Sequence, residues 1–424
     1  MYENKTLCKE LLYRHNYKPQ GSPDSNGSSC CSSDDIIAVT DIWDGHVYKD
    51  LKERRTKVHN KELLSKYFAD EHDLALGLST DGFALWRKCK YTTWPLLIFD
   101  YHLSPEERFH QNNIIPISVI PGPKKLKDID LFLHPLVQEL HILANGVQAF
   151  DASTGELFCL CAFLIVVFSN ILVMSLLMKM KGHNSVSSCR TCRICGLCIT
   201  EGDNKVHYVP LDRSSHPQAG KIPIYDPENL SMQTHQQFLN DAQSVITAKT
   251  RAEEEKLAKA NRIKGKTILT SLDSLSFPSS MPYDFMHLVY ENLLKNLICL
   301  WTNDFKGLDT GTGDYTLDPT VWDAIGSATA RACDTIPSAY CARLASILGD
   351  RSTFTADNYS FWALYIGPVL LSQKFSWQQY YNHFVKLVKL IHTCLKFEYT
   401  AGDVRNICEG FRDWVITYEE YMIV

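Results

Sequence analysis

The stretch from Asp73 to Cys192 constrains the fold of this chain more than any other part of the sequence. Three short apolar runs bounded by turn signals predict three consecutive strands, over residues 74–80 (LALGLST), 94–103 (WPLLIFDYHL) and 113–120 (NIIPISVI). Residues 127–145 then place apolar side chains at helical spacing, and an apolar block begins at Leu157. The order strand, strand, strand, helix, strand predicts one mixed α/β unit.

This order is typical of a ribonuclease H-like core, in which an antiparallel meander is followed by a helical crossover. The right-handed crossover lays the fourth strand parallel to the first, so the ends of these two strands lie side by side. Asp81 follows the first strand, and Asn170 lies near the end of the fourth. We therefore expect an α/β fold with a mixed sheet, at whose edge these two side chains meet, and a mainly helical C-terminal lobe.

Length and composition indicate how the whole chain is divided into segments. With 424 residues, 45% apolar content and a net charge of -5, the chain can form two or three domains, each with its own core. The slightly acidic balance lacks the basic surplus that nucleic-acid-binding domains usually carry. We expect four segments: a disordered arm over residues 1–38, the ribonuclease H-like core over 39–200, a linker and charged helix over 201–265, and a helical lobe over 266–424.

Two further helices are predicted outside the strand-rich unit. In residues 41–68 the apolar side chains, among them Val47, Leu51 and Val58, follow helical spacing. Residues 240–262 are charged and rich in alanine, which is typical of a helix with a solvated face.

Several motifs along the chain resemble transposases of the CACTA (En/Spm) group. They include FADEHDLALGLSTDGF, WPLLIFDYHLSPEERF, VIPGPKKLKDIDLFLHPLVQEL, MKMKGHNSVSSCRTC and MPYDFMHLVYENLLKNLICLW, and the similarity covers roughly residues 40 to 424. The resemblance implies an ancestor that cut and joined DNA by metal-dependent phosphoryl transfer. It also implies a truncated and degenerate copy, because the family sequence continues beyond Val424 and differs near Asn170.

The implied chemistry requires acidic side chains. Carboxylates hold two Mg²⁺ ions about 4 Å apart, and these ions stabilise the attacking and leaving oxygens. The first acid of the family lies in the motif that matches STDGF, so the resemblance assigns its role to Asp81. The second acid is expected shortly before the Cys-x-x-Cys pair, where the family pattern FGD is FSN in this chain and Asn170 replaces the acid. Because an amide brings no charge to a metal pair, we expect a catalytically inactive protein.

Two other acidic residues are alternatives. Asp151, in VQAFDAS, is the fallback for the second acid, and with it the protein would be an active DNA transposase. A loop aspartate that caps a turn is the simpler interpretation. Glu291, in HLVYENL, is the nearest candidate for the third acid, although the last glutamate of the family can lie beyond Val424. A solvated helical glutamate explains Glu291 equally well.

The 15 cysteines do not form the even framework of a short secreted chain, so we expect reduced thiols. Cys189 and Cys192 have the spacing of a zinc knuckle, and the family resemblance implies that Asp284 and His287 complete the site. Zn²⁺ would then attach the segment after the fourth strand to the helical lobe. Plain reduced surface thiols are the alternative.

The apolar block over residues 157–178 also allows a membrane-spanning helix. Only Ser169, Asn170 and Ser175 interrupt it, and as a helix it would exceed a bilayer core of about 30 Å. The positive charges that follow would put the C-terminal side in the cytosol. The competing interpretation is a buried central strand that passes into a helix.

DNA is the partner that the resemblance implies, bound weakly or no longer bound. A DNA groove could be bordered by the basic residues Arg87, Lys88, Lys90, Lys124, Lys125 and Lys127, and a solvated charge run is the alternative. A nuclear location follows from the same resemblance, whereas a span over 157–178 would mean a membrane location. A homo-oligomer is compatible with the sequence.

Overall fold

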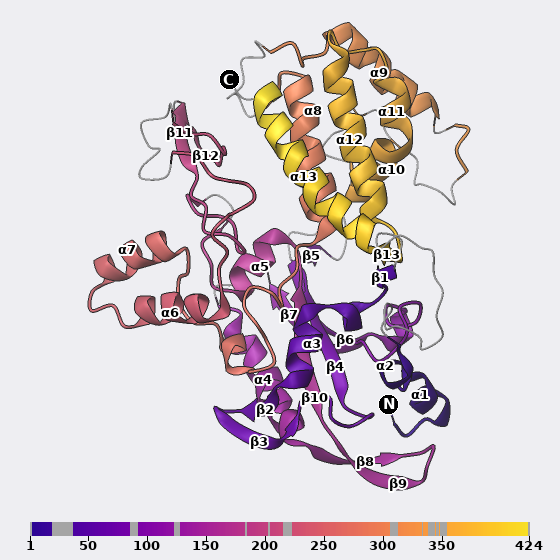
Figure 1. The fold of residues 1–424 in the computed structure, drawn as a ribbon, viewed down its shortest axis with the longest axis vertical. Coiled ribbons are helices and arrows are strands. Elements are labelled where there is room, and N and C mark those ends of the chain that lie inside the picture. The colour runs from indigo at the N-terminus through magenta and orange to yellow at the C-terminus, as the bar shows by residue number, and fades with distance from the viewer. Residues whose placement is uncertain are drawn as a thin grey trace, which may run out of the picture.

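The computed structural model has a sheet-containing part and a helical part (Figure 1). The structure describes residues 2–18, 37–84, 92–122, 128–182, 185–201, 204–214, 223–305, 313–332, 334–337, 344, 347 and 354–422. A mixed sheet and many helices occur together, so the predicted mixed α/β class is confirmed.

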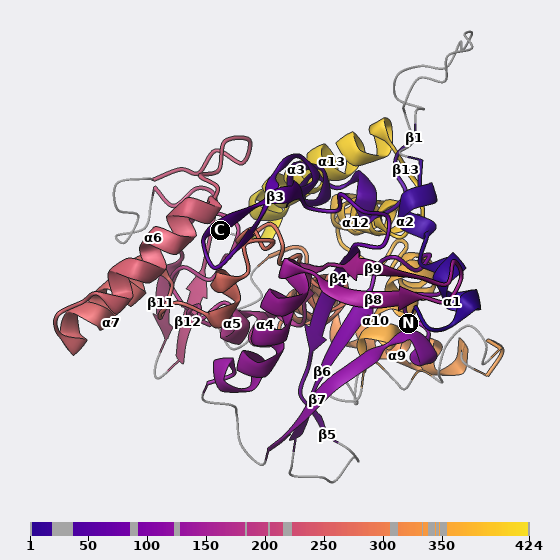
Figure 2. The same ribbon diagram turned by 90° about the horizontal axis from the view of Figure 1, so that it is seen from below.

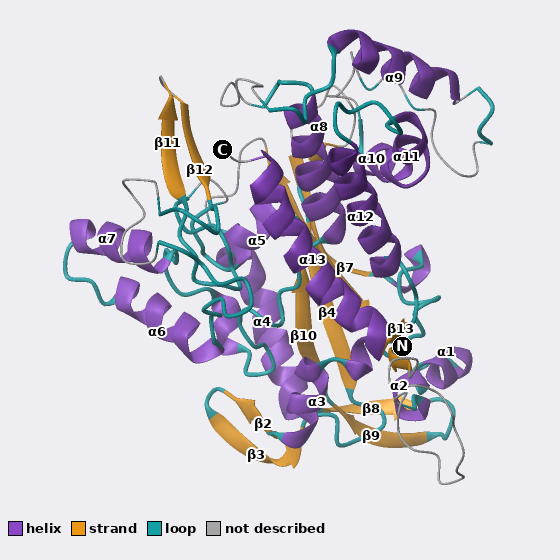
Figure 3. Ribbon diagram, turned by 45° about the horizontal axis from the view of Figure 1, so that its top comes forward, coloured by secondary structure: helices purple, strands orange, loops and turns teal. Residues whose placement is uncertain are grey.

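The central sheet has five strands. They are β4 (Leu74–Thr80), β5 (Phe83–Ala84), β6 (Thr92–Asp100), β7 (Ile115–Gly122) and β10 (Ala162–Phe168). β6 pairs antiparallel with β4 and β5 along one edge and with β7 along the other. β10 pairs parallel with β4, and the two lie side by side (Figure 3). The three consecutive strands predicted from the sequence are therefore present, and the fourth runs parallel to the first.

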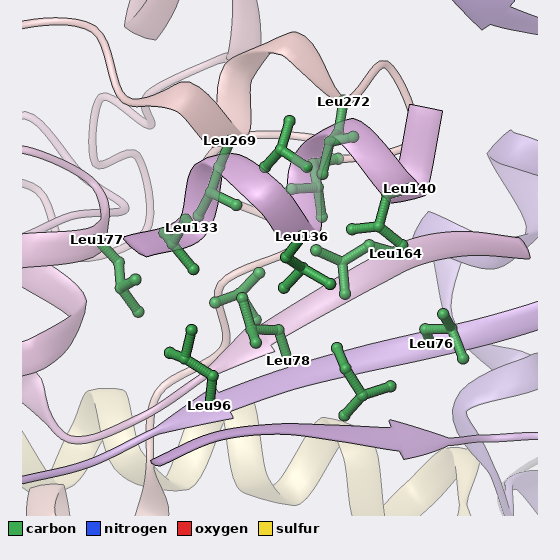
Figure 4. Packing of buried hydrophobic residues seen from close by; sticks show 14 of the residues in the cluster. Leu76, Leu78, Leu96, Leu133, Leu136, Leu140, Leu164, Leu177, Leu269 and Leu272 are labelled. Carbon is green, nitrogen blue, oxygen red and sulfur yellow. The ribbon is translucent and has the colours of Figure 1, made fainter. Parts of the chain in front are cut away.

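Helix α4 (Asp130–Asn145) makes the crossover between β7 and β10. Its buried face includes Leu133, Leu136 and Leu140, which recur at the helical period. Figure 4 shows these leucines over the strands, where they meet Leu78 of β4 and Leu164 of β10. The apolar stripe of α4 thus fixes the helix on one face of the sheet.

Strands β4 and β10 are buried on both faces, because successive side chains of a strand point to opposite sides. Leu78 and Leu164 belong to the core under α4, whereas Ala75 and Phe163 belong to a second core on the opposite face. That second core also contains Trp43, Tyr48, Leu51, Tyr67 and Phe68. Burial on both faces explains why these strands are continuous apolar runs.

The apolar block over residues 157–178 is divided among three elements. They are β9 (Glu156–Leu160), β10 and α5 (Ile171–Leu177). The polar side chain of Asn170 accepts a hydrogen bond at the N-terminus of α5, where the strand gives way to the helix. In the described part of the chain, no helix combines the length and apolar content needed to cross a bilayer. The membrane-spanning alternative is therefore not supported.

The helix predicted over residues 41–68 is wrong for its second half. Helix α3 (His46–Glu53) is followed by a hairpin of β2 (Arg55–Val58) and β3 (Lys61–Lys66). His59 and Asn60 make the turn with φ values of 52° and 63°, the left-handed backbone that two-residue hairpin turns require. The spacing of apolar residues in this segment fitted a helix, but the turn ends the helical pattern. A short helix η2 (Ile42–Asp44) precedes α3.

The arm expected over residues 1–38 is folded at its start. Helices α1 (Lys5–Glu10) and α2 (Tyr13–Asn16) bury Cys8 and Leu11 in the core under α4. The backbone carbonyl of Tyr2 accepts a hydrogen bond from Ala152 N–H in the turn after β8 (Val147–Asp151), and Figure 2 shows α1 beside the β8–β9 hairpin. β1 (Ile37–Val39) pairs with β13 (Tyr399–Thr400). Residues 19–36 of the expected arm lie outside the described residues.

The helical lobe has its own core, which contains Trp301, Trp362 and Trp414. Its helices are η5 (Met286–Leu294), α8 (Lys295–Trp301), α9 (Pro319–Ala332), α10 (Ala356–Phe361), η6 (Trp362–Ile366), α11 (Gly367–Leu370), α12 (Gln378–Cys394) and α13 (Ala401–Met422). The expected boundary at residue 266 is too early, because Leu269, Phe277 and other side chains of this segment pack in the sheet core. The lobe begins with η5.

The segment between the sheet and the lobe contains more structure than the expected linker with one helix. It holds the ribbon β11 (Leu197–Glu201) and β12 (Asn204–Tyr208), and two helices, α6 (His235–Ile246) and α7 (Arg251–Asn261). Thr250 caps α7, so the predicted helix over 240–262 is interrupted. Figures 1 and 3 show the α6–α7 pair projecting from the sheet. The remaining short helices are η3 (Gln111–Asn113) and η4 (Ile268–Ser271).

Candidate active site

The ends of β4 and β10 bring Asp81 and Asn170 together. Phe168 pairs with Ser79 in the parallel register, so the residues that follow each strand emerge at the same edge of the sheet. The Nδ2 group of Asn170 donates a hydrogen bond to Oδ1 of Asp81 at 2.6 Å. The two positions expected to hold acids in the resembled family are therefore in direct contact.

Both polar ends of the Asn170 amide are engaged. Its Oδ1 accepts a hydrogen bond from the backbone N–H of Val173 at 2.9 Å and so caps α5. Its Nδ2 faces Asp81, which can only accept when ionised. The two contacts agree on which end of the amide is the nitrogen. The hydroxyl of Ser169 donates to the carbonyl of Thr80 and ties the same two strand ends together.

Asp81 has a raised pKa. Partial burial is the main cause, and the nearby charge of Asp284 raises the pKa further. Three neighbours act in the opposite direction: the N–H of Gly82, which donates at 2.7 Å, the charge of His287, and the amide of Asn170. Two of these influences, Asp284 and His287, come from the segment at the start of the helical lobe.

Asp284, His287 and Glu291 form a linked group at the start of η5. His287 Nδ1 lies 2.7 Å from Oδ2 of Asp284, and its backbone N–H donates to Oδ1 of the same side chain at 3.2 Å. His287 Nε2 lies 3.6 Å from Oε2 of Glu291. Glu291, the candidate third acid, thus lies beside His287, whose charge influences Asp81. Sequence reasoning missed this grouping, because it assigned Asp284 and His287 to a zinc site.

The donor set at the strand ends does not fit a pair of divalent ions. Such a pair needs carboxylate oxygens from both strand ends. Asp81 supplies one carboxylate, but Asn170 presents N–H groups to it and uses its oxygen for the helix cap. Across the described ranges, no group of three or more His, Cys, Asp or Glu side chains is arranged to hold a metal ion.

The predicted zinc ligands fall into two separate pairs. The thiol of Cys192 donates to Sγ of Cys189 at 3.0 Å, and this hydrogen bond lowers the pKa of Cys189 and raises that of Cys192. Asp284 and His287 are bonded to each other instead of completing the cysteine pair. The hydroxyl of Tyr283 lies 3.4 Å from Sγ of Cys189. The arrangement gives no support for zinc, which remains a prediction.

Asp151 lies at the opposite end of β4 from Asp81. Its Oδ2 is 3.6 Å from Nε2 of His72, which precedes β4, and a strand of this length separates its two ends by about 20 Å. Burial alone would raise the pKa of Asp151, but hydrogen bonds from Ser153 and Thr154 hold it well below its usual value. Asp151 therefore caps its own turn, and the alternative in which it partners Asp81 is wrong for this structure.

The basic residues expected to border a DNA groove all lie outside the described residues. They are Arg87, Lys88, Lys90, Lys124, Lys125 and Lys127.

Residues 53–219 match the family model described as Transposase family tnp2. This match supports a transposase-family protein. It includes β4, β10 and both strand-end residues, Asp81 and Asn170, whereas the group at the start of η5 follows the matched segment. No curated protein matches the chain.

Proposed function

We propose that this protein is derived from a CACTA-type DNA transposase and has lost metal-dependent strand cleavage. The match over residues 53–219 supports the transposase origin. The order β4, β6, β7, α4, β10, with β10 parallel to β4, supports a ribonuclease H-like core for the ancestral enzyme.

The hydrogen bond between Asn170 and Asp81 carries the proposal. Two carboxylates at this separation would repel each other and would need a shared proton or a bound cation. The amide of Asn170 supplies a hydrogen-bond donor in place of that cation, so the pair is stable without a metal. The polar side chains at the two strand ends thus form their hydrogen bonds with other groups of the protein.

The negative charge that Asn170 lacks is enough to remove useful catalysis. Losing about 4 kcal/mol of transition-state stabilisation slows a reaction roughly a thousandfold. The two metal ions stabilise the attacking and the leaving oxygen in phosphoryl transfer, so the loss of a carboxylate that holds them affects both. Glu291, held by His287, is our candidate for the third ancestral acid.

We also propose that the protein is nuclear and that any remaining activity is DNA binding. A core that has lost its metal ligands can keep phosphate contacts, because these depend on basic side chains and not on the catalytic acids.

Mn²⁺ binding to the full chain tests the loss of the metal site. Calorimetric titration is expected to detect no binding to the wild type at submillimolar Mn²⁺, and clear binding to Asn170→Asp, because this change restores the second carboxylate. Asn382→Asp, which adds a carboxylate on an exposed face of α12, is the matched control and should behave like the wild type.

A DNA cleavage assay can contradict the proposal that catalysis is lost. If the wild-type protein cuts DNA carrying the ends of its transposon in the presence of Mg²⁺, and Asp81→Asn abolishes the cut, the proposal of lost catalysis is wrong.

A further inference from the structure

Helix α3 and the β2–β3 hairpin carry a local excess of basic side chains. Residues 49–66 contain seven lysines and arginines and three acidic residues, a net charge of +4 in a chain whose net charge is -5. All seven basic side chains are exposed, and they define the basic hairpin surface: Lys49, Lys52, Arg54, Arg55, Lys57, Lys61 and Lys66. We propose that this surface binds the phosphate backbone of duplex DNA. The inference deepens the DNA binding proposed above and rests on it for the class of partner.

The hairpin directs basic side chains outward because alternate residues of β2 are buried. Thr56 is 1% exposed and Val58 is 3% exposed, whereas Arg55 and Lys57 face the solvent. Lys66 of β3 lies opposite Arg55 in the register and shares its outward face. Because the inner face packs on the protein, the hairpin cannot enter a DNA groove. Its outer face is suited to the phosphates that border a groove, which fix a protein on the duplex without reading its sequence.

Helix α3 extends the basic hairpin surface. One face of the helix is buried in the second core, and Lys49 and Lys52, three residues apart, lie on the exposed side. The ammonium group of Lys66 donates to Oε2 of Glu53 at 3.0 Å, which ties β3 to the helix. Figures 1 and 3 show α3 beside the hairpin. The basic side chains of the helix and of the hairpin therefore belong to one continuous surface.

The acidic residues of this segment neutralise only part of its positive charge. Glu53 pairs with Lys66 at 3.0 Å, and Glu62 pairs with Arg55 at 3.8 Å. Four ammonium groups have no carboxylate within 4 Å among the residues that the structure describes, those of Lys49, Lys52, Lys57 and Lys61. Exposed cations of this kind attract a polyphosphate, because each phosphate contact releases counterions condensed on the DNA.

The basic hairpin surface lies at the opposite end of the sheet from the candidate active site. Lys57 lines a small cavity together with Ala162, the first residue of β10, whereas Asn170 follows the last residue of that strand. A strand of this length spans about 20 Å. Figures 1 and 2 show the hairpin and β5, which follows Asp81, at opposite ends. Phosphate binding here uses none of the candidate acids, so it survives the loss of the metal site.

Fluorescence anisotropy of the full chain with a labelled duplex of about 20 base pairs and mixed sequence tests the proposal, at about 50 to 200 mM salt. The triple variant Lys49→Gln, Lys52→Gln, Lys57→Gln should bind at least about tenfold more weakly at about 100 mM salt. The slope of log affinity against log salt should become shallower by about 2 to 3, since each phosphate contact contributes about 0.9.

A matched variant removes the same charge from another part of the protein. Lys256→Gln, Lys259→Gln, Lys389→Gln changes exposed side chains on α7 and α12 and should bind within about twofold of the wild type, because phosphate contacts act locally. Thermal unfolding of both triple variants should match the wild type, since all six lysines are exposed.

Lysine acetylation, mapped by mass spectrometry with and without the duplex, locates the contact in the wild type. DNA should protect Lys49, Lys52, Lys57 and Lys61 and leave Lys389 reactive. If the wild type binds the duplex but both triple variants weaken equally, this surface is the wrong one, while the DNA binding of the proposed function stands. If the wild type binds no duplex at about 50 mM salt, both are wrong. Protection of these lysines by anionic lipid vesicles and not by the duplex also overturns the inference.

Discussion

Asn170 and Asp81 are 89 positions apart in the chain, yet the amide of one donates to the carboxylate of the other at 2.6 Å. The contact exists because β10 lies parallel to β4 and both strands end at the same edge. It leaves Asp81 with a partner but with its negative charge partly buried and close to Asp284.

Replacement of Asp81 by Asn is expected to stabilise the protein at neutral pH. Burial and Asp284 raise the folded-state pKa of Asp81 above its ordinary value of 3.8, so the folded state binds the proton more tightly than the unfolded state. The stability that Asp81 contributes is therefore present at low pH and is lost as the pH rises through the folded-state pKa. For this partly exposed group the gain at pH 7 should be below about 1 kcal/mol.

Urea unfolding of the wild type and Asp81→Asn at pH 7 and at about pH 3 measures this effect, because the second pH lies below the ordinary carboxyl pKa. A gain that is larger at the acidic pH than at pH 7 would contradict the sign of the pKa shift.

Asn170→Ala should destabilise the fold by about 1–2 kcal/mol, because it removes both the cap of α5 and the hydrogen bond to Asp81. Asn170→Ser keeps a capping oxygen and should recover most of this loss. Denaturant unfolding of the two variants separates the contributions. Equal losses in both would mean that the contact with Asp81, and not the cap, stabilises this strand end.

Gly77→Ala should destabilise the sheet by about 1–3 kcal/mol, because the interior is already fully packed around this position. A Cβ at Gly77 would lie 2.6 Å from a ring carbon of Tyr101 and 3.1 Å from Cγ1 of Val166. Gly182→Ala is the matched control, since its Cβ would meet no atom within 4 Å. Thermal unfolding compares the two, and an equal effect at both positions would argue against this packing.

Leu140→Ala tests which face of α4 packs on the sheet. Leu140 is 2% exposed in the core, and its truncation should cost about 2–5 kcal/mol through lost burial and the cavity left behind. Ile142 on the same helix is 60% exposed, so Ile142→Ala should change the free energy of unfolding by less than about 1 kcal/mol. Denaturant titration of both variants measures the difference. A larger loss of stability for Ile142→Ala than for Leu140→Ala would mean that the opposite face of α4 packs on the sheet.

Local patterns were sufficient for much of the fold. The apolar runs of β4, β6 and β7 and the leucine stripe of α4 predicted these elements, because each element buries side chains at its own period. The same pattern failed over residues 41–68, where the spacing of apolar residues fitted a helix and the left-handed turn at His59 and Asn60 produced a hairpin.

The candidate site was predictable only in part. The order of strands implied that the ends of β4 and β10 meet, but not that Asn170 turns its nitrogen toward Asp81 while its oxygen caps α5. The family resemblance suggested Asp284 and His287 as metal ligands, and the structure instead pairs them with each other.

The sequence by itself determined strands β4, β6 and β7, the crossover helix α4 and the residues at the strand ends, since these follow from short-range periodicity and connection rules. Only the tertiary structure decided which of those polar groups touch. Asp151 and Asp81 were both candidates for the pair of metal-binding acids, yet one lies beside His72 at the start of β4 and the other beyond its end. Contacts between residues far apart in the chain depend on how the layers pack, and no local pattern encodes that packing.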